Sequence, residues 1–421
     1  MSKYKNCFFV CLLVLFFGHI SFVNAQQSTK ADTLKKTSSF GIKFKGFVKS
    51  DYWYDRRQVF TTREDLFLFY PLNIKADKNG QDINAQPTLN FTAMTSRLCG
   101  LISGPDAFGA KTSGFIEADF SGVSNADING LRLRHAYGKL TWSKSELLFG
   151  QYWHPMFVSE VCPSVISLNT GAPFQPFNRN PQLSYTRFLG KFNLNAVFIT
   201  QRDNSNDGPL SYSATYLRNA LIPNVDLQLQ YKGSHNVLGI AGDYKILRPR
   251  MVTDSLFATK QTIPTFAAMA YWKYTKGDFT WKCKAIFGQN LTEHLMLGGY
   301  AVKSIDSTSM LETYTPTNHL FVWGNALYTL KKKIQFGLFG GYAKNLGTTA
   351  LNTGKYYARG SDIAYIYRVA PSVSFISNKT QISTELEYTT AAFGNPDLMG
   401  IVQNAKEVTN IRLLLTFFYF F

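Results

Sequence analysis

Stretches of about ten residues in which apolar and polar side chains alternate recur along most of the chain. The clearest stretch covers residues 40–55, FGIKFKGFVKSDYWYD. Its even-numbered positions are mostly apolar or aromatic, and its odd-numbered positions carry all of its charges. Because successive side chains of a strand point to opposite faces, this period of two predicts a strand with one apolar and one polar face.

Sixteen stretches of this kind are present between residue 40 and the C-terminus. The others lie near 87–102, 112–120, 130–142, 146–153, 182–189, 192–201, 224–232, 236–247, 263–274, 279–288, 318–330, 334–344, 362–376, 380–390 and 407–421. Short polar turns such as LGKF and TKGD alternate with long loops, the longest near 56–86, 154–181, 202–223 and 289–317.

An even number of strands, with short turns at one rim and long loops at the other, is typical of a transmembrane antiparallel β-barrel. We therefore predict an all-β fold, a barrel of about 16 strands over residues 40–421. Boundary errors of a few residues would allow 14 or 18 strands. The alternative, a soluble open sheet, is disfavoured because so many strands rarely stay in one open sheet.

The C-terminal sequence NIRLLLTFFYFF ends without a polar tail. Leu413, Leu415, Phe417, Tyr419 and Phe421 fall on one face of the last predicted strand, which we expect to contact lipid. If this strand closes the barrel against the first one, no strand edge remains exposed.

The N-terminal 25 residues have the pattern of a secretory signal peptide. A basic start, an apolar stretch and a small residue, Ala25, follow one another. Gly18, His19 and Ser21 interrupt the apolar stretch, which disfavours a membrane anchor. We expect residues 26–39 to form a flexible periplasmic leader, and no later stretch approaches the roughly 18 apolar residues of a membrane helix.

The net charge of +17 includes Lys3 and Lys5, which leave with the signal peptide. The remaining excess suits anionic solutes or lipid head groups. A nucleic-acid partner is disfavoured because the protein is expected to be exported and contains no basic run or nucleic-acid motif.

No catalytic, cofactor or metal site is predicted. Cys99, Cys162 and Cys283 are widely spaced, which predicts isolated thiols rather than metal ligands or a disulfide framework. The histidines are scattered, TEHL at 292–295 lacks the two histidines of a metalloprotease motif, and His135 falls on the apolar side of its strand.

Residues 94–157 resemble the general trimeric porins of Gram-negative outer membranes, in which SRL, an acidic strand, LRHAY and a GQ strand recur in this order. The stretches FKGFVKSDYWYDRRQ at 44–58 and SLNTGAPFQPFNRNPQL at 167–183 are similar to porin-like proteins of the Bacteroidota, akin to the DcaP-type porins. The close resemblance covers residues 44–183, although DcaP-type proteins carry a longer helical leader than this chain.

The resemblance implies an outer-membrane homotrimer of 16-stranded barrels, surrounded by lipid and lipopolysaccharide. It also implies insertion by the barrel assembly machinery, which reads a C-terminal aromatic strand. In such porins the loop after the fifth strand folds into the pore. Here that loop is 154–181, with Glu160, Asn169 and Arg179 as its candidate pore-facing residues. An ordinary external loop is the alternative.

Charges on the polar faces of the strands predict the lining of a lumen, because arginine in lipid would be costly. The basic candidates are Lys43, Lys45, Lys49, Arg97, Arg132, Arg134 and Arg368, with Lys232, Lys282 and Lys284 on the same kind of face. The acidic candidates are Glu117, Asp119, Glu385 and Glu387, together with Asp51 and Asp55. Cross-strand pairing of Arg132 or Arg134 with Glu117 or Asp119 is the alternative role for these arginines.

These patterns favour a porin for passive diffusion of small hydrophilic solutes, with a weak-to-moderate preference for anions. Two alternatives stay open. One is a binding or adhesion barrel whose lumen is plugged, and the other is a barrel hydrolase.

Overall fold

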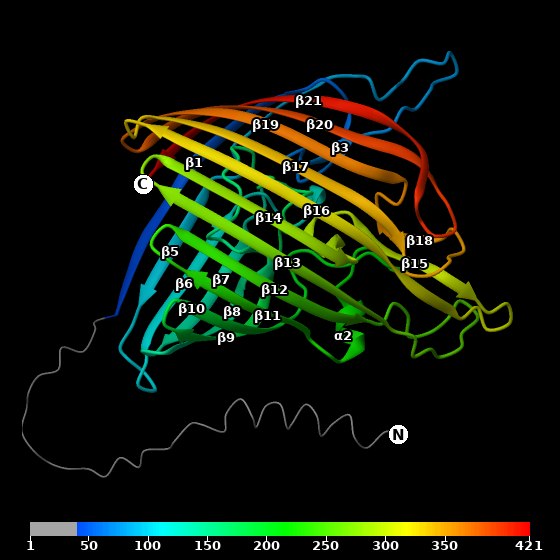
Figure 1. Ribbon diagram of the computed structural model, residues 1–421, viewed down its shortest axis with the longest axis horizontal. Helices are drawn as coiled ribbons and strands as arrows, with labels where there is room; N and C mark the ends of the chain where they lie inside the picture. Colours follow the sequence, from blue (N-terminus) through cyan, green and yellow to red (C-terminus); the bar gives the residue numbers. More distant parts are fainter. Residues whose placement is uncertain (1–39) are drawn as a thin grey trace, which may run out of the picture. The chain divides into compact units, whose positions relative to one another are not determined.

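The computed structural model describes residues 40–421, which form a closed 16-strand antiparallel β-barrel (Figure 1). The predicted fold class is therefore confirmed. The predicted signal peptide and leader, residues 1–25 and 26–39, lie outside the described residues. No helix within residues 40–421 has the length and apolar character needed to span a membrane.

The wall of the barrel consists of strands that pair with their neighbours in chain order. They are β1 (Gly41–Asp55), β4 (Thr88–Thr92) with β5 (Arg97–Ser103), β6 (Lys111–Asp119), β7 (Arg132–Thr141), β8 (Ser145–Trp153), β9 (Arg179–Leu189), β10 (Phe192–Ile199), β11 (Asn224–Lys232), β12 (Asn236–Leu247), β13 (Ile263–Lys276), β14 (Phe279–Gln289), β16 (Glu312–Leu330), β17 (Ile334–Thr348), β19 (Ile363–Ser377), β20 (Thr380–Pro396) and β21 (Val402–Phe420).

The first and last strands close the barrel. β1 pairs with β21 from Phe47↔Phe420 to Asp55↔Arg412, and on its other side with β4 and β5. Leu413, Leu415 and Phe417 of β21 are exposed on the outer surface, whereas the intervening Arg412 and Leu414 are buried inside. The alternation predicted for the C-terminal strand is therefore confirmed.

One predicted strand is interrupted. The stretch 87–102 forms β4 and β5, which both pair with β1, separated by a turn at residues 93–96. Met94 N–H donates to the Thr92 hydroxyl and Ser96 N–H to the Ala93 carbonyl, so these residues bend out of the ladder. This bend explains why the alternation of apolar and polar residues is poor there.

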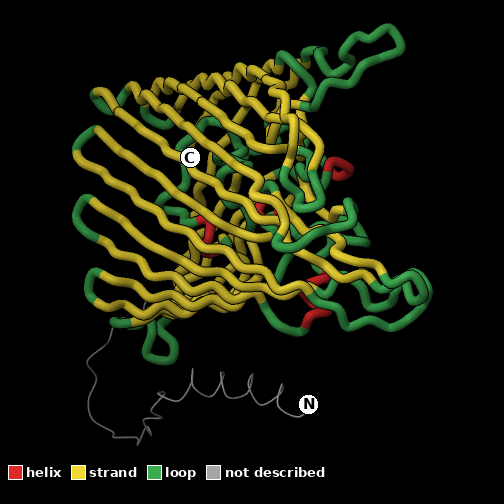
Figure 2. Tube along the Cα trace, turned by 45° about the vertical axis from the view of Figure 1, so that its right-hand side comes forward, coloured by secondary structure: helices red, strands yellow, loops and turns green. Residues whose placement is uncertain are grey.

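The two ends of the barrel differ, as the sequence predicts. Short turns join the strands at one end and long loops at the other (Figure 2). The long loops contain elements that were not predicted: the hairpin β2 (Val59–Thr62) and β3 (Phe67–Pro71), helix α2 (Thr215–Ala220), β15 (Gly298–Ile305), β18 (Tyr356–Arg359), and the 3₁₀ turns η1 (Asn125–Asp127), η2 (Pro155–Phe157) and η3 (Thr292–His294). β15 pairs with both β16 and β18, which extends the wall beyond the barrel.

Candidate functional site in the barrel interior

The interior of the barrel carries charged side chains at the seam between its first and last strands. Arg412 Nε and Nη2 donate to Asp55 Oδ1 and Oδ2 at 3.0 and 2.6 Å. Beside this pair, Asp51 accepts a hydrogen bond from the Thr416 hydroxyl at 2.7 Å and lies 3.1 Å from Lys49 Nζ. This bidentate Arg–Asp pair holds β1 and β21 together, and each of its two buried charges compensates the other.

Five arginines and three carboxylates gather where β5, β6, β7 and the start of β9 meet the loops that follow β2 and β10. We call this group the arginine cluster, and its members are Arg63, Arg97, Arg132, Arg134, Arg179, Glu117, Asp119 and Asp203. Five guanidinium groups face three carboxylates, so the cluster carries a positive excess when all members are ionised.

Asp119 lies at the centre of the arginine cluster. Arg132 Nη2 and Arg134 Nη1 lie 2.8 and 2.9 Å from Asp119 Oδ2, and Arg134 Nε lies 2.5 Å from Glu117 Oε1. Arg132 and Arg134 are both 2% exposed. The structure thus forms the cross-strand ion pairs that the sequence left as the alternative role for these arginines.

The remaining members surround this centre. Arg179 Nη2 lies 2.6 Å from Asp203 Oδ2, and Arg97 Nη1 lies 3.6 Å from Glu117 Oε1. Burial opposes ionisation of Asp203, but the guanidinium groups of Arg179 and Arg132 outweigh it and lower the pKa of this loop carboxyl. Burial and the nearby Arg132 lower the pKa of Arg63 to about 10, which leaves it protonated at neutral pH.

The predicted position of His135 on the apolar side of its strand is wrong. The pairing of β6 with β7 shifts register between Glu117↔His135 and Ala118↔Leu133, which leaves Arg134 as an extra residue. Such a bulge turns the following side chains to the other face. His135 is consequently buried, 4.0 Å from Glu117 Oε1 and in ring contact with Trp153.

The other predicted basic residues take different positions along the interior. Lys43 and Lys45 lie on the inward face of β1 near the short-turn end and are exposed, whereas Lys49 is buried and donates to the Ile166 carbonyl at 3.3 Å. Arg368 is buried, and its guanidinium donates to the carbonyls of Ala172 and Leu68, both at 2.8 Å.

The loop between β8 and β9, residues 154–178, folds into the interior and hydrogen-bonds to the wall. Lys284 Nζ donates to the carbonyls of Met156 and Phe157 at 2.8 and 2.9 Å, and Trp323 Nε1 donates to Gln175 Oε1 at 3.1 Å. These wall residues belong to β14 and β16, so the loop crosses the interior to reach them.

Further along the wall, three strands from β16, two acidic residues of β20 hold the middle of this loop. Glu385 Oε2 and Oε1 accept hydrogen bonds from the backbone N–H groups of Ile166 and Ser167 at 2.8 and 3.2 Å. Glu387 Oε1 accepts one from Asn169 Nδ2 at 2.6 Å. Glu385 and Glu387 therefore anchor the loop, and Asn169 is a buried anchor rather than a group open to solvent.

The two charged candidates of this loop are placed differently. Glu160 is exposed and pairs with Lys232 at 2.8 Å. Arg179 does not belong to the loop, because Trp153 pairs with Arg179 and extends the β8–β9 ladder further than the sequence predicted. The loop thus ends at residue 178 instead of 181, and Arg179 lies on the wall within the arginine cluster.

Two further segments enter the interior, and neither was predicted to do so. All residues of β3 are buried, and Phe67 packs its ring against Phe177 with centroids 4.9 Å apart. The segment after β14 buries Leu291, Leu295 and neighbouring apolar residues. Together with loop 154–178, these segments form a contiguous apolar core inside the long-loop half of the barrel.

A cavity of about 480 Å³, lined by both charged and apolar residues, opens among the long loops. Arg63, Asp203 and Arg359 line it together with aromatic residues that include Phe60 and Tyr212. Arg359 is held by the carbonyls of Thr292 and Met296 and stacks against Phe69 and Tyr212. Because Arg63 and Asp203 belong both to the cavity lining and to the arginine cluster, this cavity adjoins the cluster.

Sequence reasoning missed the loop residues Arg63, Asp203 and Arg359, which no periodic pattern marks. It also missed Asp226 and Asp243, two buried inward residues of β11 and β12. The sequence does contain a signal for Asp226, because this charged residue lies between the apolar Val225 and Leu227, as an inward residue of a strand would.

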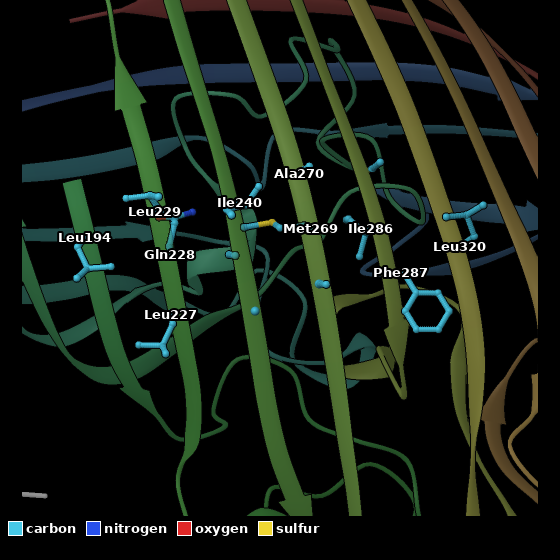
Figure 3. Close-up of a pocket in the computed structure, with 14 residues that line it drawn as sticks. Leu194, Leu227, Gln228, Leu229, Ile240, Met269, Ala270, Ile286, Phe287 and Leu320 are labelled. Carbon is cyan, nitrogen blue, oxygen red and sulfur yellow. The ribbon is translucent and has the colours of Figure 1, made fainter. Parts of the chain in front are cut away.

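The outer surface bears a groove of about 630 Å³ over β10 to β16, lined almost entirely by apolar residues (Figure 3). Leu194, Leu227, Ile240 and Phe287 are exposed there, and small residues such as Ala268 form its floor. It belongs to the outward apolar face and takes no part in the polar interior.

No protein-family model matches the chain, and no curated protein matches it either. Solved structures do match. The outer membrane channel DcaP of Acinetobacter baumannii is 17% identical, with 94% of this chain and 100% of that chain covered and a TM-score of 0.69.

Two other solved structures match a similar share of the chain. OmpT, an outer membrane protein of Vibrio cholerae, is 11% identical, covering 94% and 100% of the two chains with a TM-score of 0.52. An anion-selective porin from Comamonas acidovorans is 10% identical, covering 91% and 100% with a TM-score of 0.54. At these identities the similarity shows a shared barrel fold.

Proposed function

We propose that this protein is an outer-membrane porin that lets small hydrophilic solutes diffuse passively, with a weak-to-moderate preference for anions. The observation that carries the proposal is the arginine cluster, in which five guanidinium groups face three carboxylates inside a closed barrel. Channels and porins among the structures with this fold support it.

The path of the solute would follow the side of the interior that the loops leave polar. Ser184, Thr186 and Asn195 of β9 and β10 form a hydrogen-bonded uncharged surface there. Gln228 and Gln230 continue this surface on β11. Donors and acceptors of this kind exchange hydrogen bonds with a hydrated solute, while the arginine cluster supplies the charge preference.

The cavity among the long loops would form the outer entrance. It adjoins the arginine cluster through Arg63 and Asp203. Arg97 lies on the side of the cluster that faces the short-turn end and keeps about a fifth of its side chain exposed. An anion entering the cavity would therefore meet successive guanidinium groups, whose donors suit carboxylates and phosphates.

We further propose an outer-membrane location, insertion by the barrel assembly machinery, contact with lipid and lipopolysaccharide, and assembly as a homotrimer. The exposed apolar face of the wall, including Leu413, Leu415 and Phe417, supports contact with lipid. The proposal involves no catalysis, no cofactor and no nucleic acid.

A barrel with a plugged lumen, used for binding or adhesion, is the second candidate. The observation that favours it is the apolar core formed inside the barrel by β3, loop 154–178 and the segment after β14. In such a protein the long loops would present the functional surface, and solutes would not cross.

Swelling of proteoliposomes that contain the folded protein distinguishes the two functions. We expect arabinose and gluconate to enter, with gluconate faster than a cation of similar size such as lysine. Replacing Arg97 with Gln should reduce the advantage of gluconate without abolishing entry of arabinose. The matched control is Lys331→Gln, which removes one exposed positive charge from a short turn.

Equal effects of the two substitutions would show that the preference arises from overall charge and not from the arginine cluster. A folded protein that admits none of these solutes would refute the porin and favour the plugged barrel.

A further inference from the structure

Three potential metal ligands from separate segments meet near the start of loop 154–178. His154 follows β8 directly, Asp226 lies on β11 and Asp243 on β12. Asp226 and Asp243 are direct cross-strand partners. One ligand atom of each residue lies within 4.8 Å of the other two, and the three residues are 1%, 0% and 5% exposed.

The negative charge of this cluster is only partly compensated. Within residues 40–421, no group donates a hydrogen bond to either carboxylate oxygen of Asp226. Asp243 Oδ2 accepts a hydrogen bond from Asn224 Nδ2 at 2.7 Å. Lys245, the next inward residue of β12, instead directs its ammonium group to Glu293 and to the Asn290 carbonyl. Two adjacent buried carboxylates without a cation are costly, because burial disfavours unpaired charge.

The geometry suits a transition-metal ion. His154 Nε2 lies 3.5 Å from Asp243 Oδ2 and 3.1 Å from Asn224 Oδ1. Zinc–ligand bonds of about 2.0–2.2 Å in a tetrahedron place neighbouring ligand atoms about 3.3–3.6 Å apart. Small side-chain rotations would bring Asp226 to the same spacing, and Asn224 Oδ1 could serve as a fourth ligand.

We propose that His154, Asp226 and Asp243 bind one divalent first-row transition-metal ion. An imidazole nitrogen combined with carboxylate oxygens suits zinc and its neighbours better than calcium or magnesium, which prefer all-oxygen sites. Coordination by Nε2 places the ring proton on Nδ1, so the 3.3 Å contact from Met156 N–H to Nδ1 would have to lengthen. This inference is independent of the proposed porin function.

Such an ion would have a structural consequence. It would tie the first residue of loop 154–178 to β11 and β12, next to the point where Lys284 already holds the Met156 and Phe157 carbonyls. The ion would therefore fix the root of the loop that folds into the interior.

The test is calorimetric titration of the full folded barrel with Zn²⁺ after treatment with a chelator, with Co²⁺ absorption as a second readout. We expect one ion per chain at micromolar affinity or tighter, and a Co²⁺ spectrum in the visible range. Asp226→Asn should weaken Zn²⁺ binding at least a hundredfold. This variant is expected to fold, since it removes a buried unpaired charge.

Glu160→Gln is the matched control, because it removes an exposed carboxylate from the same loop and should leave binding unchanged. Equal binding by Asp226→Asn and Glu160→Gln would show adventitious surface binding and overturn the proposal. Absence of saturable Zn²⁺ binding would overturn it too, and would indicate that the two aspartates share a proton. If Ca²⁺ displaced Zn²⁺ at similar concentration, the role of His154 would be refuted.

Discussion

Glu385 offers a direct test of how loop 154–178 is held inside the barrel. Its carboxylate accepts hydrogen bonds from the N–H groups of Ile166 and Ser167 at 2.8 and 3.2 Å, and Glu385→Ala removes both. Each buried N–H group that is left without an acceptor costs about 1–3 kcal/mol. Loss of Glu385 also removes an acidic group beside Glu387, so we take a value in the lower half of this range, about 3 kcal/mol for the two N–H groups together. At about 1.4 kcal/mol per tenfold change, the ratio of docked to undocked loop should fall about a hundredfold.

The native Cys162 thiol of the same loop reports this change. Burial raises the pKa of Cys162, so the docked loop holds little reactive thiolate near neutral pH. Undocking should lower the pKa towards that of a free thiol. In a chain of residues 26–421 with Cys99→Ser and Cys283→Ser, Glu385→Ala should therefore speed maleimide labelling and move its pH profile to lower pH.

Ser383→Ala is the matched control. Ser383 lies on the same inward face of β20, but its hydroxyl donates to Ser374 of the wall rather than to the loop. Its labelling rate should equal that of the parent chain. If Glu385→Ala left the labelling rate and its pH profile unchanged, the anchoring role of Glu385 would be refuted.

Three further predictions concern the arginine cluster, the loop and the outer face. Arg134→Ala should destabilise the barrel by about 3–5 kcal/mol, because Glu117 and Asp119 lose a buried partner. Arg97→Ala should destabilise it less. Urea unfolding in detergent measures both variants, and equal effects would contradict the structure. Gly341→Leu should displace the loop, because a Cβ there would lie 2.6 Å from the Phe174 ring, and should increase single-channel conductance. Leu413→Arg should cost about 2–4 kcal/mol in lipid, measured by folding into vesicles, and a neutral result would contradict its lipid-facing position.

The strands of the barrel were predictable because each one has a lipid-side and an interior face, which imposes a period of two on the sequence. The same period identified Arg132, Arg134 and Arg368 as inward residues. It failed at His135, because a bulge at Arg134 changes the parity of the strand and a single sequence carries no signal for that extra residue.

The segments inside the barrel could not be predicted in this way. β3, FLFYP, is buried at every position, so it shows no alternation. Loop 154–178 is mostly uncharged and is held largely through its backbone N–H and carbonyl groups, which every sequence supplies. The meeting of Arg63 and Asp203 with Arg132 likewise depends on three separate segments, whose positions only the closed barrel fixes.

The most direct test of the proposed function is the reversal potential of the folded protein in a planar bilayer with a tenfold gradient of potassium chloride. We predict conductance in steps of three and a reversal potential of the sign that a modest chloride preference gives. Arg97→Gln should move that potential towards zero. A clear potassium preference at neutral pH would contradict the role of the arginine cluster, and a silent bilayer with correctly folded protein would contradict the porin itself.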